Sequence, residues 1–331
     1  MNRLLKRVIV AMLLGVAVYA AFALYTGFDR MAGSLGNFRW SSFALALLLS
    51  SFNYLLRFGK WQYYLRRLGV SGVRPFDSLL VFLSGFVLTV TPGKVGEVFK
   101  SAVLAKTHGV PAAQTAPIVI ADRLTDVIAI VILIMIGSTT FQGGFGWAIA
   151  GTLAVGCGLL AILWQTPTLA ALSFLAQRRG FLGRIAPKLV EAYASLRILA
   201  APVALLWPTL LSVIGWGAEA LALFLIVRGF GEELPLGRSM FFYSTATLAG
   251  ALIPVPGGLG IVEGMIREQL VRLSAVAEGS ATASMMLIRF ATLWWSVALG
   301  FAALGWLRLR FPRELGGDTA LPVAAVAPGE D

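Results

Sequence analysis

Long apolar runs separated by short polar segments dominate the sequence. Two examples, VIVAMLLGVAVYAAFALY at 8–25 and DVIAIVILIMIG at 126–137, are too apolar for helices on the surface of a soluble protein. A helix that crosses a bilayer needs about 20 mainly apolar residues, and several runs reach that length. The pattern therefore predicts an all-α, polytopic membrane protein. The expected spanning segments are 8–25, 40–56, 112–140, 146–165, 203–227 and 281–306.

Two further apolar segments, 77–106 and 238–273, are each interrupted near the middle by a cluster of proline and glycine. The interruptions read TPGKVGEVFK at 91–100 and IPVPGGLGIVEG at 253–264. Proline ends a helix and glycine lets the backbone turn, so each segment is expected to be a broken or re-entrant pair of helices. Unpaired backbone groups cannot face lipid, and the broken chain must therefore line a cavity or be buried in protein.

The interrupted segments belong to two similar units. Residues 40–140 and 203–306 each read as helix, interrupted segment, helix, with the motif PGxxG at 92–96 in the first unit and at 256–260 in the second. An arginine follows the proline of this motif by 31 residues in the first unit and by 33 in the second. The units are expected to begin on opposite sides of the membrane. They predict a bundle of two inverted-topology repeats, with the functional site where the two breaks meet.

Lysine and arginine are unevenly distributed between the loops. The segments 1–7, 57–74, 166–200 and 307–331 hold 16 of them, whereas 26–39, 141–145 and 228–238 hold four. Cytoplasmic loops carry the excess of these residues, so we expect both termini in the cytoplasm, in a protein of the cytoplasmic membrane. The net charge of +11 then reflects topology and gives no reason to expect a nucleic-acid partner. We expect one membrane domain over 1–310 and a disordered cytoplasmic tail over 311–331.

Composition supports this class and limits the chemistry. The chain is 58% hydrophobic and 13% charged, whereas soluble domains carry about 25% charged residues. Cys157 and His108 are each the single residue of their type in the sequence. One cysteine and one histidine cannot form a disulfide framework or a zinc site built from those residues. We therefore expect neither a cofactor nor a metal.

The first break carries charged residues. It is expected to end one helix and begin another, whose N-terminal N–H groups suit a phosphate or a carboxylate. Lys94 and Lys100 would strengthen that attraction, and Glu97 would offset part of it or carry a proton. The alternative is a cytoplasmic loop whose lysines touch anionic lipid headgroups. The candidate residues are Pro92, Gly93, Lys94, Gly96, Glu97 and Lys100.

The second break lacks lysine but has a glutamate, Glu263, in the first turn of the helix expected after it. A carboxylate at that place either caps the helix or takes part in transport. Glu97 is its counterpart in the first break, which favours a role in transport. The candidate residues are Pro256, Gly257, Gly258, Gly260 and Glu263.

Several charged residues fall inside expected spanning helices. Asp122 and Asp126 are four residues apart and share a helical face, with Arg123 beside them. A charge near the centre of a bilayer costs roughly 2.5–3.5 kcal/mol on insertion scales, so such residues mark a pathway or an internal ion pair. Glu219 has no partner within its own helix, and we expect it to pair with Arg289.

A polar face is also predicted in the second spanning segment. Asn53, Arg57 and Trp61 are spaced four apart, which places an amide, a guanidinium and an indole on one side of a helix near the cytoplasmic boundary. They are secondary candidates for the site. The alternative is an anchor at the membrane interface.

Together these residues resemble the lysylphosphatidylglycerol-synthase transmembrane, or flippase-like, family. The resemblance rests on Arg57 and Trp61, PGKVGE with Lys100, DRLTD at 122–126, IPVPGGLGIVE and Arg289. It implies an integral membrane protein that handles lipids, which in the best-known members moves an aminoacylated phospholipid between leaflets. The chain ends soon after its last expected helix, so we expect no synthase activity, and the cargo need not be lysylphosphatidylglycerol.

The function that fits these observations is translocation of a phospholipid or lipid-linked precursor, with an anionic or zwitterionic headgroup, across the membrane. We expect a transporter and not an enzyme, and homo-oligomers are compatible with it. No GxxxxGK[ST] motif occurs, so uphill transport would need an ion gradient, with Glu97, Glu219 and Glu263 as candidate proton carriers. Two alternatives stay open: an intramembrane lipid-phosphate transferase whose two aspartates hold a divalent cation, and an ion-coupled exporter of a small anion.

Overall fold

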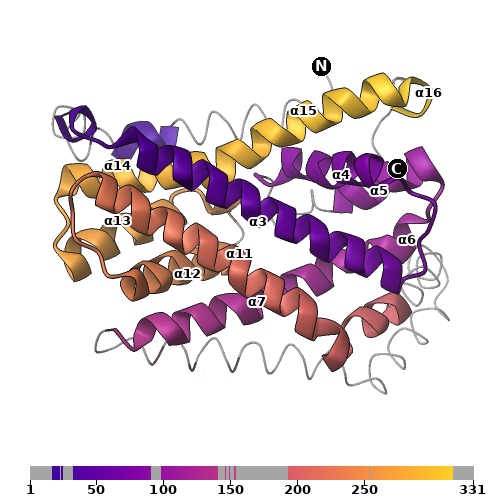
Figure 1. The fold of residues 1–331 in the computed structure, drawn as a ribbon, viewed down its shortest axis with the longest axis horizontal. Helices are drawn as coiled ribbons and strands as arrows, with labels where there is room; N and C mark the ends of the chain where they lie inside the picture. The colour runs from indigo at the N-terminus through magenta and orange to yellow at the C-terminus, as the bar shows by residue number, and fades with distance from the viewer. Residues whose placement is uncertain are drawn as a thin grey trace, which may run out of the picture.

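The computed structural model of the protein describes residues 17–22, 24, 33–90, 98–140, 146, 149, 153, 193–253 and 255–315. Every regular element within these ranges is a helix (Figure 1), which agrees with the expected class. Most of the expected spans 8–25 and 146–165 lies outside the described residues. So do the tail from 316 onward and five candidate residues of the first break. Those five are Pro92, Gly93, Lys94, Gly96 and Glu97.

Three helices in the described part are long and apolar enough to cross a membrane. They are α3 (Trp40–Arg67), α11 (Pro202–Gly229) and a continuous helix from Glu278 to Arg310 made of α14 (Glu278–Arg289), the π-helical turn η4 (Phe290–Trp294) and α15 (Trp295–Arg310). The 28 residues of α3 extend about 42 Å at 1.5 Å per residue, more than the roughly 30 Å of a hydrocarbon core.

Helix α3 extends beyond the expected apolar span 40–56 and continues to Arg67. The helix therefore includes Arg57 and Trp61, which the sequence placed on one helical face with Asn53. Trp61, Tyr64 and Leu65 extend its buried apolar face, so packing holds the last three turns in the helix. Charges assigned to a loop consequently lie inside the protein.

The two interrupted segments are helices that stop and start again. The first comprises α4 (Pro75–Ser84), η1 (Gly85–Leu88) and α5 (Val98–His108); the second comprises α12 (Leu236–Leu252), η3 (Pro256–Gly258) and α13 (Ile261–Ser274). In the second break Gly257, Gly258 and Gly260 have φ of 61°, 67° and 86°. Side chains disfavour this left-handed region, which explains the run of glycines. Helices α6 (Ala112–Thr115) and α7 (Pro117–Ser138) follow the first segment.

Helices α3 and α11 lie against each other in opposite directions (Figure 1). The N–H of Arg39, just before α3, donates to the carbonyl of Gly229 at the end of α11, 3.0 Å away. Halfway along the pair, Gly215 faces Asn53 so closely that a Cβ atom at position 215 would overlap the Asn53 Oδ1 atom. Small residues that allow such close approach are typical of helix contacts in membranes.

The loops gather at two opposite ends of the bundle (Figure 1). At one end the ion pair between Asp77 and Arg310 joins the start of α4 to the end of α15. At the other, the Arg238 Nη1 atom donates to the Leu273 carbonyl at 2.8 Å, joining the start of α12 to the end of α13.

Each half of the chain also packs a helix against the interrupted segment of the other half. Helix α7 packs on α12, and Gly137 lies directly against the backbone of Phe241. Helix α15 packs on α4 and η1, and Gly300 lies directly against the backbone of Val87. Large apolar side chains point outward on the long helices, including Leu45, Leu48, Phe52 and Leu55 of α3 and Val203, Leu206, Leu210 and Ile214 of α11. The outer surface of these helices is therefore suited to lipid.

Candidate functional site

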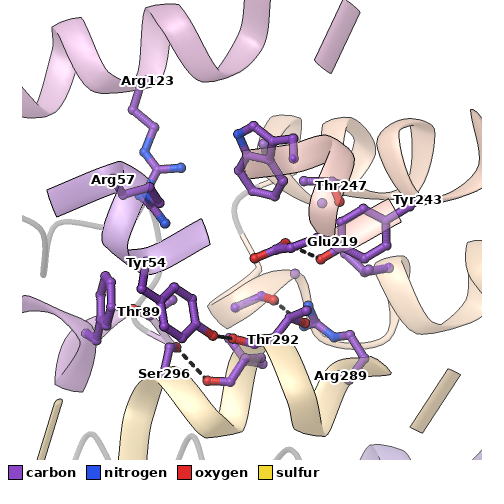
Figure 2. Close-up of a pocket in the computed structure, with 18 residues that line it drawn as sticks. Tyr54, Arg57, Thr89, Arg123, Glu219, Tyr243, Thr247, Arg289, Thr292 and Ser296 are labelled. Atoms are coloured by element: carbon purple, nitrogen blue, oxygen red, sulfur yellow. Dashed lines mark hydrogen bonds between the residues drawn. The ribbon is translucent and has the colours of Figure 1, made fainter. Parts of the chain in front are cut away.

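A cavity of about 90 Å³, lined by both polar and apolar side chains, lies between the helices (Figure 2). Phe86 and Thr89, which precede the first break, line it together with Gly257 and Gly258 of the second. The second break therefore lies beside the residues that lead into the first break, whose own residues 91–97 lie outside the described part, so the meeting of the two breaks stays a prediction. The polar side chains of the lining are Tyr54, Arg57, Thr89, Arg123, Glu219, Tyr243, Thr247, Arg289, Thr292 and Ser296.

Three arginines from different helices reach this cavity. Arg57 of α3 and Arg123 of α7 lie on one side, and Arg289 of α14 lies across from them (Figure 2). Glu219 is the single carboxylate among the described residues of the lining. The cavity wall therefore carries more positive than negative side chains, and carboxylates behind the wall pair with the arginines.

Arg57 and Arg123 belong to an ionic cluster that extends from the cavity wall into the protein. We define this ionic cluster as Arg57, Lys60, Asp122, Arg123 and Asp126. The Lys60 Nζ atom lies 2.6 Å from Asp122 Oδ1 and 2.8 Å from Asp126 Oδ1. The Arg57 Nη2 atom lies 3.3 Å from Asp122 Oδ2 and 3.9 Å from Asp126 Oδ2. The Arg123 Nη1 atom also lies 3.9 Å from Asp126 Oδ2. The two aspartates share one face of α7 as predicted, and that face binds three cations.

Lys60 was missed as a site residue because it was counted with the basic loop 57–74. Its side chain is fully buried and also donates to Ser212 Oγ on α11 at 2.6 Å. The spacing of seven residues between Asn53 and Lys60, two helical turns, could have placed both on the same face. Removing Arg57 and Lys60 from the loop count leaves 14 basic residues (16 − 2) against four, so the expected orientation is unchanged.

Arg289 and Glu263 form a second ionic contact, at the other break. The Arg289 Nε atom lies 2.6 Å from Glu263 Oε1, and its Nη2 atom donates to the Gly257 carbonyl at 2.7 Å. The other carboxylate oxygen of Glu263 accepts from the N–H of Gly260 at 2.7 Å and so caps α13. Glu263 is therefore a cap of α13, one of the two roles that the sequence left as alternatives, and it also pairs with Arg289. Its part in transport stays a prediction.

The expected pairing of Glu219 with Arg289 is wrong. Glu219 Oε1 accepts from Asn53 Nδ2 at 2.6 Å, and Oε2 accepts from the Tyr243 hydroxyl at 2.5 Å. Arg289 is held instead by Glu263 and the backbone of the second break, both nearer in the chain. Glu219 is thus a buried carboxylate bound by two neutral donors at the crossing of α3 and α11.

Trp61 and Lys100 lie behind the cavity wall rather than in it. The Trp61 indole is 1% exposed and donates to Ser78 Oγ at 3.1 Å, which rules out an interfacial anchor for this side chain. The Lys100 ammonium lies 4.9 Å from the centre of the Trp61 ring and 5.4 Å from that of Phe82. Both distances are within the range of cation–π interaction. Lys100 is buried, so it is not a headgroup-facing loop lysine.

A family model described as the lysylphosphatidylglycerol synthase TM region matches residues 12–300. The chain belongs to this family. A UPF0104 membrane protein of Pyrococcus horikoshii is 26% identical over 319 residues, covering 87% of this chain and 93% of that protein. The chain is accordingly a membrane protein, as the sequence indicated.

Several of the residues that carried the resemblance, among those that the structure describes, lie close together. Arg57, the aspartates of DRLTD and Arg289 surround or adjoin the cavity, and Trp61 with Lys100 packs behind it. The aspartates are poor candidates for a divalent cation, because the Lys60 ammonium already lies between their oxygens. A metal would have to displace a buried and fully paired lysine.

Proposed function

We propose that this protein translocates the headgroup of a phospholipid or lipid-linked precursor across the cytoplasmic membrane, without enzymatic turnover. The observation that carries the proposal is the cavity with three arginines and one carboxylate, enclosed by helices whose outer surfaces are apolar. Guanidinium groups bind phosphate through two parallel hydrogen bonds, and they keep their charge at physiological pH. The acyl chains would stay in the bilayer while the headgroup passes through the cavity.

The proposal includes two inverted repeats, α3–α7 and α11–α15. Three observations support it: α3 packs against α11, each half places a helix on the broken segment of the other, and each broken segment begins and ends at one end of the bundle, where Asp77 and His108 contact neighbouring residues at the end of α15 and Arg238 contacts Leu273. Asn53 and Glu219 are in contact and 166 residues apart, and Arg123 and Arg289 share this separation (289 − 123). A contact between equivalent positions is what a twofold axis through the α3–α11 crossing requires.

Transport requires a second conformation. A cavity of about 90 Å³ has room for roughly three water molecules at about 30 Å³ each, which is less than a glycerophosphate headgroup needs. The π-helical turn η4 directly follows Arg289, and the Tyr54 hydroxyl donates to the Thr292 carbonyl within it at 2.5 Å. Such turns often occur at functional sites. Rocking of one repeat against the other about this region would widen the cavity.

The cavity size favours a second candidate, the export of a small anion. A phosphate-sized ion fits the observed volume more closely than a lipid headgroup does. The same arginines would bind it, so the chemistry of the wall alone does not separate the two cargoes.

Purified protein in liposomes would separate these candidates. Fluorescent analogues of phosphatidylglycerol and phosphatidylethanolamine would report exchange between leaflets, and entrapped radiolabelled phosphate would report export of a soluble anion. We expect faster leaflet exchange than in protein-free vesicles and no phosphate release. Phosphate release without lipid exchange would replace the first candidate by the second, and neither activity would contradict both.

A further inference from the structure

We infer that Lys60 is an internal counter-cation that keeps Asp122 and Asp126 paired when Arg57 and Arg123 bind an anionic headgroup. The inference rests on the proposed function and adds a residue that positions the binding groups. Lys60 itself does not line the cavity, whereas both arginines do. It would act by changing what those arginines bind.

The distances in the ionic cluster show an unequal competition for the two aspartates. Lys60 lies within 2.8 Å of an oxygen of each, whereas the closest approach of Arg57 is 3.3 Å and that of Arg123 is 3.9 Å. Ionic attraction rises as distance falls, and it is strong where water is excluded. Of the three cations, the lysine therefore has the strongest ionic attraction to both aspartates, and each arginine has a weaker attraction to them.

The position of Lys60 makes this pairing permanent. Its ammonium also contacts Ser212 Oγ at 2.6 Å and Thr125 Oγ1 at 3.2 Å, and its side chain is fully buried. An ammonium has three N–H donors, and all are used by α7 and α11. Lys60 could not turn to a guest without losing these bonds, so it stays with the aspartates in both the empty and the loaded state.

The consequence concerns the charge of the loaded state. When a phosphate takes Arg57 and Arg123, Asp122 and Asp126 must keep a counter-charge, because an unpaired carboxylate in the interior is very unfavourable. Lys60 supplies it. Without Lys60, both arginines would be drawn onto the aspartates, and the affinity for an anion would fall.

The test is calorimetric titration of purified protein with dihexanoyl phosphatidylglycerol, a soluble lipid with one phosphodiester. We expect Lys60→Met to weaken binding at least about tenfold, which corresponds to about 1.4 kcal/mol. Lys60→Met combined with Asp126→Asn should bind close to wild type. The double variant removes one negative charge together with the positive charge of Lys60, so the net charge of the ionic cluster is that of wild type. Lys106→Met, the same substitution away from the cavity, serves as the control and should bind as wild type does.

A merely structural role for Lys60 predicts a different result. Lys60→Met would then lower the melting temperature but leave the affinity of the folded fraction unchanged, and that outcome would overturn the inference. It would also be overturned if the double variant bound no better than Lys60→Met. If Lys60→Met does not fold, Asp126→Asn decides: binding tighter than wild type is expected, and equal or weaker binding contradicts the inference.

Two parallel measurements keep this result separate from the proposed function. Leaflet exchange by the wild type tests the function: binding that follows the expected order without exchange overturns the function alone. Exchange with equal affinities in all variants overturns the role of Lys60 alone, and no binding by the wild type overturns both. Titration with glycerol 3-phosphate identifies the source of the phosphate, because equal affinity for it would point to a soluble anion.

Discussion

Arg289 of α14 and Glu263 of α13 fix the second break to α14. Their side chains meet at 2.6 Å, and each makes a further bond to the backbone of the break, at Gly257 and Gly260 respectively. The pair is buried, with the Glu263 side chain fully enclosed. One ion pair thus sets the shape of the break and the position of an arginine in the cavity wall.

We expect Glu263→Ala to lower stability more than Glu263→Gln. The alanine removes the ion pair and the cap, whereas the glutamine keeps an oxygen that can accept from the Gly260 N–H. Breaking a buried ion pair costs about 3–5 kcal/mol, and a lost cap about 0.5–2 kcal/mol. Both variants should lose lipid exchange, since Arg289 would no longer be held in place. Melting curves in nanodiscs and the exchange assay measure these effects.

A charge-swapped variant provides the control for this prediction. Arg289→Glu with Glu263→Arg restores opposite charges but leaves the Gly257 carbonyl facing an acceptor and the Gly260 N–H facing a donor. We expect it to remain less stable than wild type. Complete recovery of stability and exchange would show that the two residues act only as a clamp between helices.

Arg123→Lys should fold normally and slow lipid exchange about tenfold or more. Lysine keeps the charge but lacks the planar fork that binds two phosphate oxygens at once. The matched control is Arg272→Lys, because Arg272 lies on the exposed face of α13, where it pairs with Glu268. Equal exchange by Arg123→Lys and wild type would exclude bidentate binding at this position.

Glu219 is expected to couple exchange to protons. Its two partners, Asn53 and Tyr243, are neutral, and the tyrosine hydroxyl can either donate to a carboxylate or accept from a carboxylic acid. An imposed pH gradient should therefore change the exchange rate of the wild type but not that of Glu219→Gln. A response of equal size in both proteins would assign coupling, if any, to another group.

Gly215→Ala should destabilise the protein by about 1–3 kcal/mol, because the added methyl group overpacks the α3–α11 contact at Asn53. Gly305→Ala is the control. It lies in α15 with nothing within 4 Å of the added Cβ, so helix propensity predicts no loss of stability. Thermal melting of both variants compares them, and equal melting temperatures would contradict the close contact.

The predicted orientation can be tested by cysteine labelling in a Cys157→Ser background. Ser101 would be a poor reporter because it is fully buried, so we choose exposed positions in two loops. Ser71→Cys is expected to react from the cytoplasm and Glu233→Cys from outside. The reverse pattern would invert the topology, and labelling of both from one side would contradict the inverted repeats.

The sequence by itself determined the class, the second helix break and the shared helical face of two aspartates. Apolar runs of this length leave few alternatives to membrane helices, and the glycines of IPVPGGLG correspond to left-handed backbone that other residues disfavour. The spacing of Asp122 and Asp126 correctly placed two carboxylates on one helical face. These features depend on local geometry, which periodicity and residue type describe directly.

The tertiary structure alone decided which charges pair. Glu219 binds Asn53 and Tyr243, Arg289 binds Glu263, and Lys60 joins the aspartates of another helix. Each long-range pairing depends on where two helices cross and on which small residue, such as Gly215, lets them approach. The sequence does not distinguish a buried lysine from a lysine in a loop. Only the packing of α3 against α7 and α11 removes Lys60 from water and places its ammonium between two aspartates.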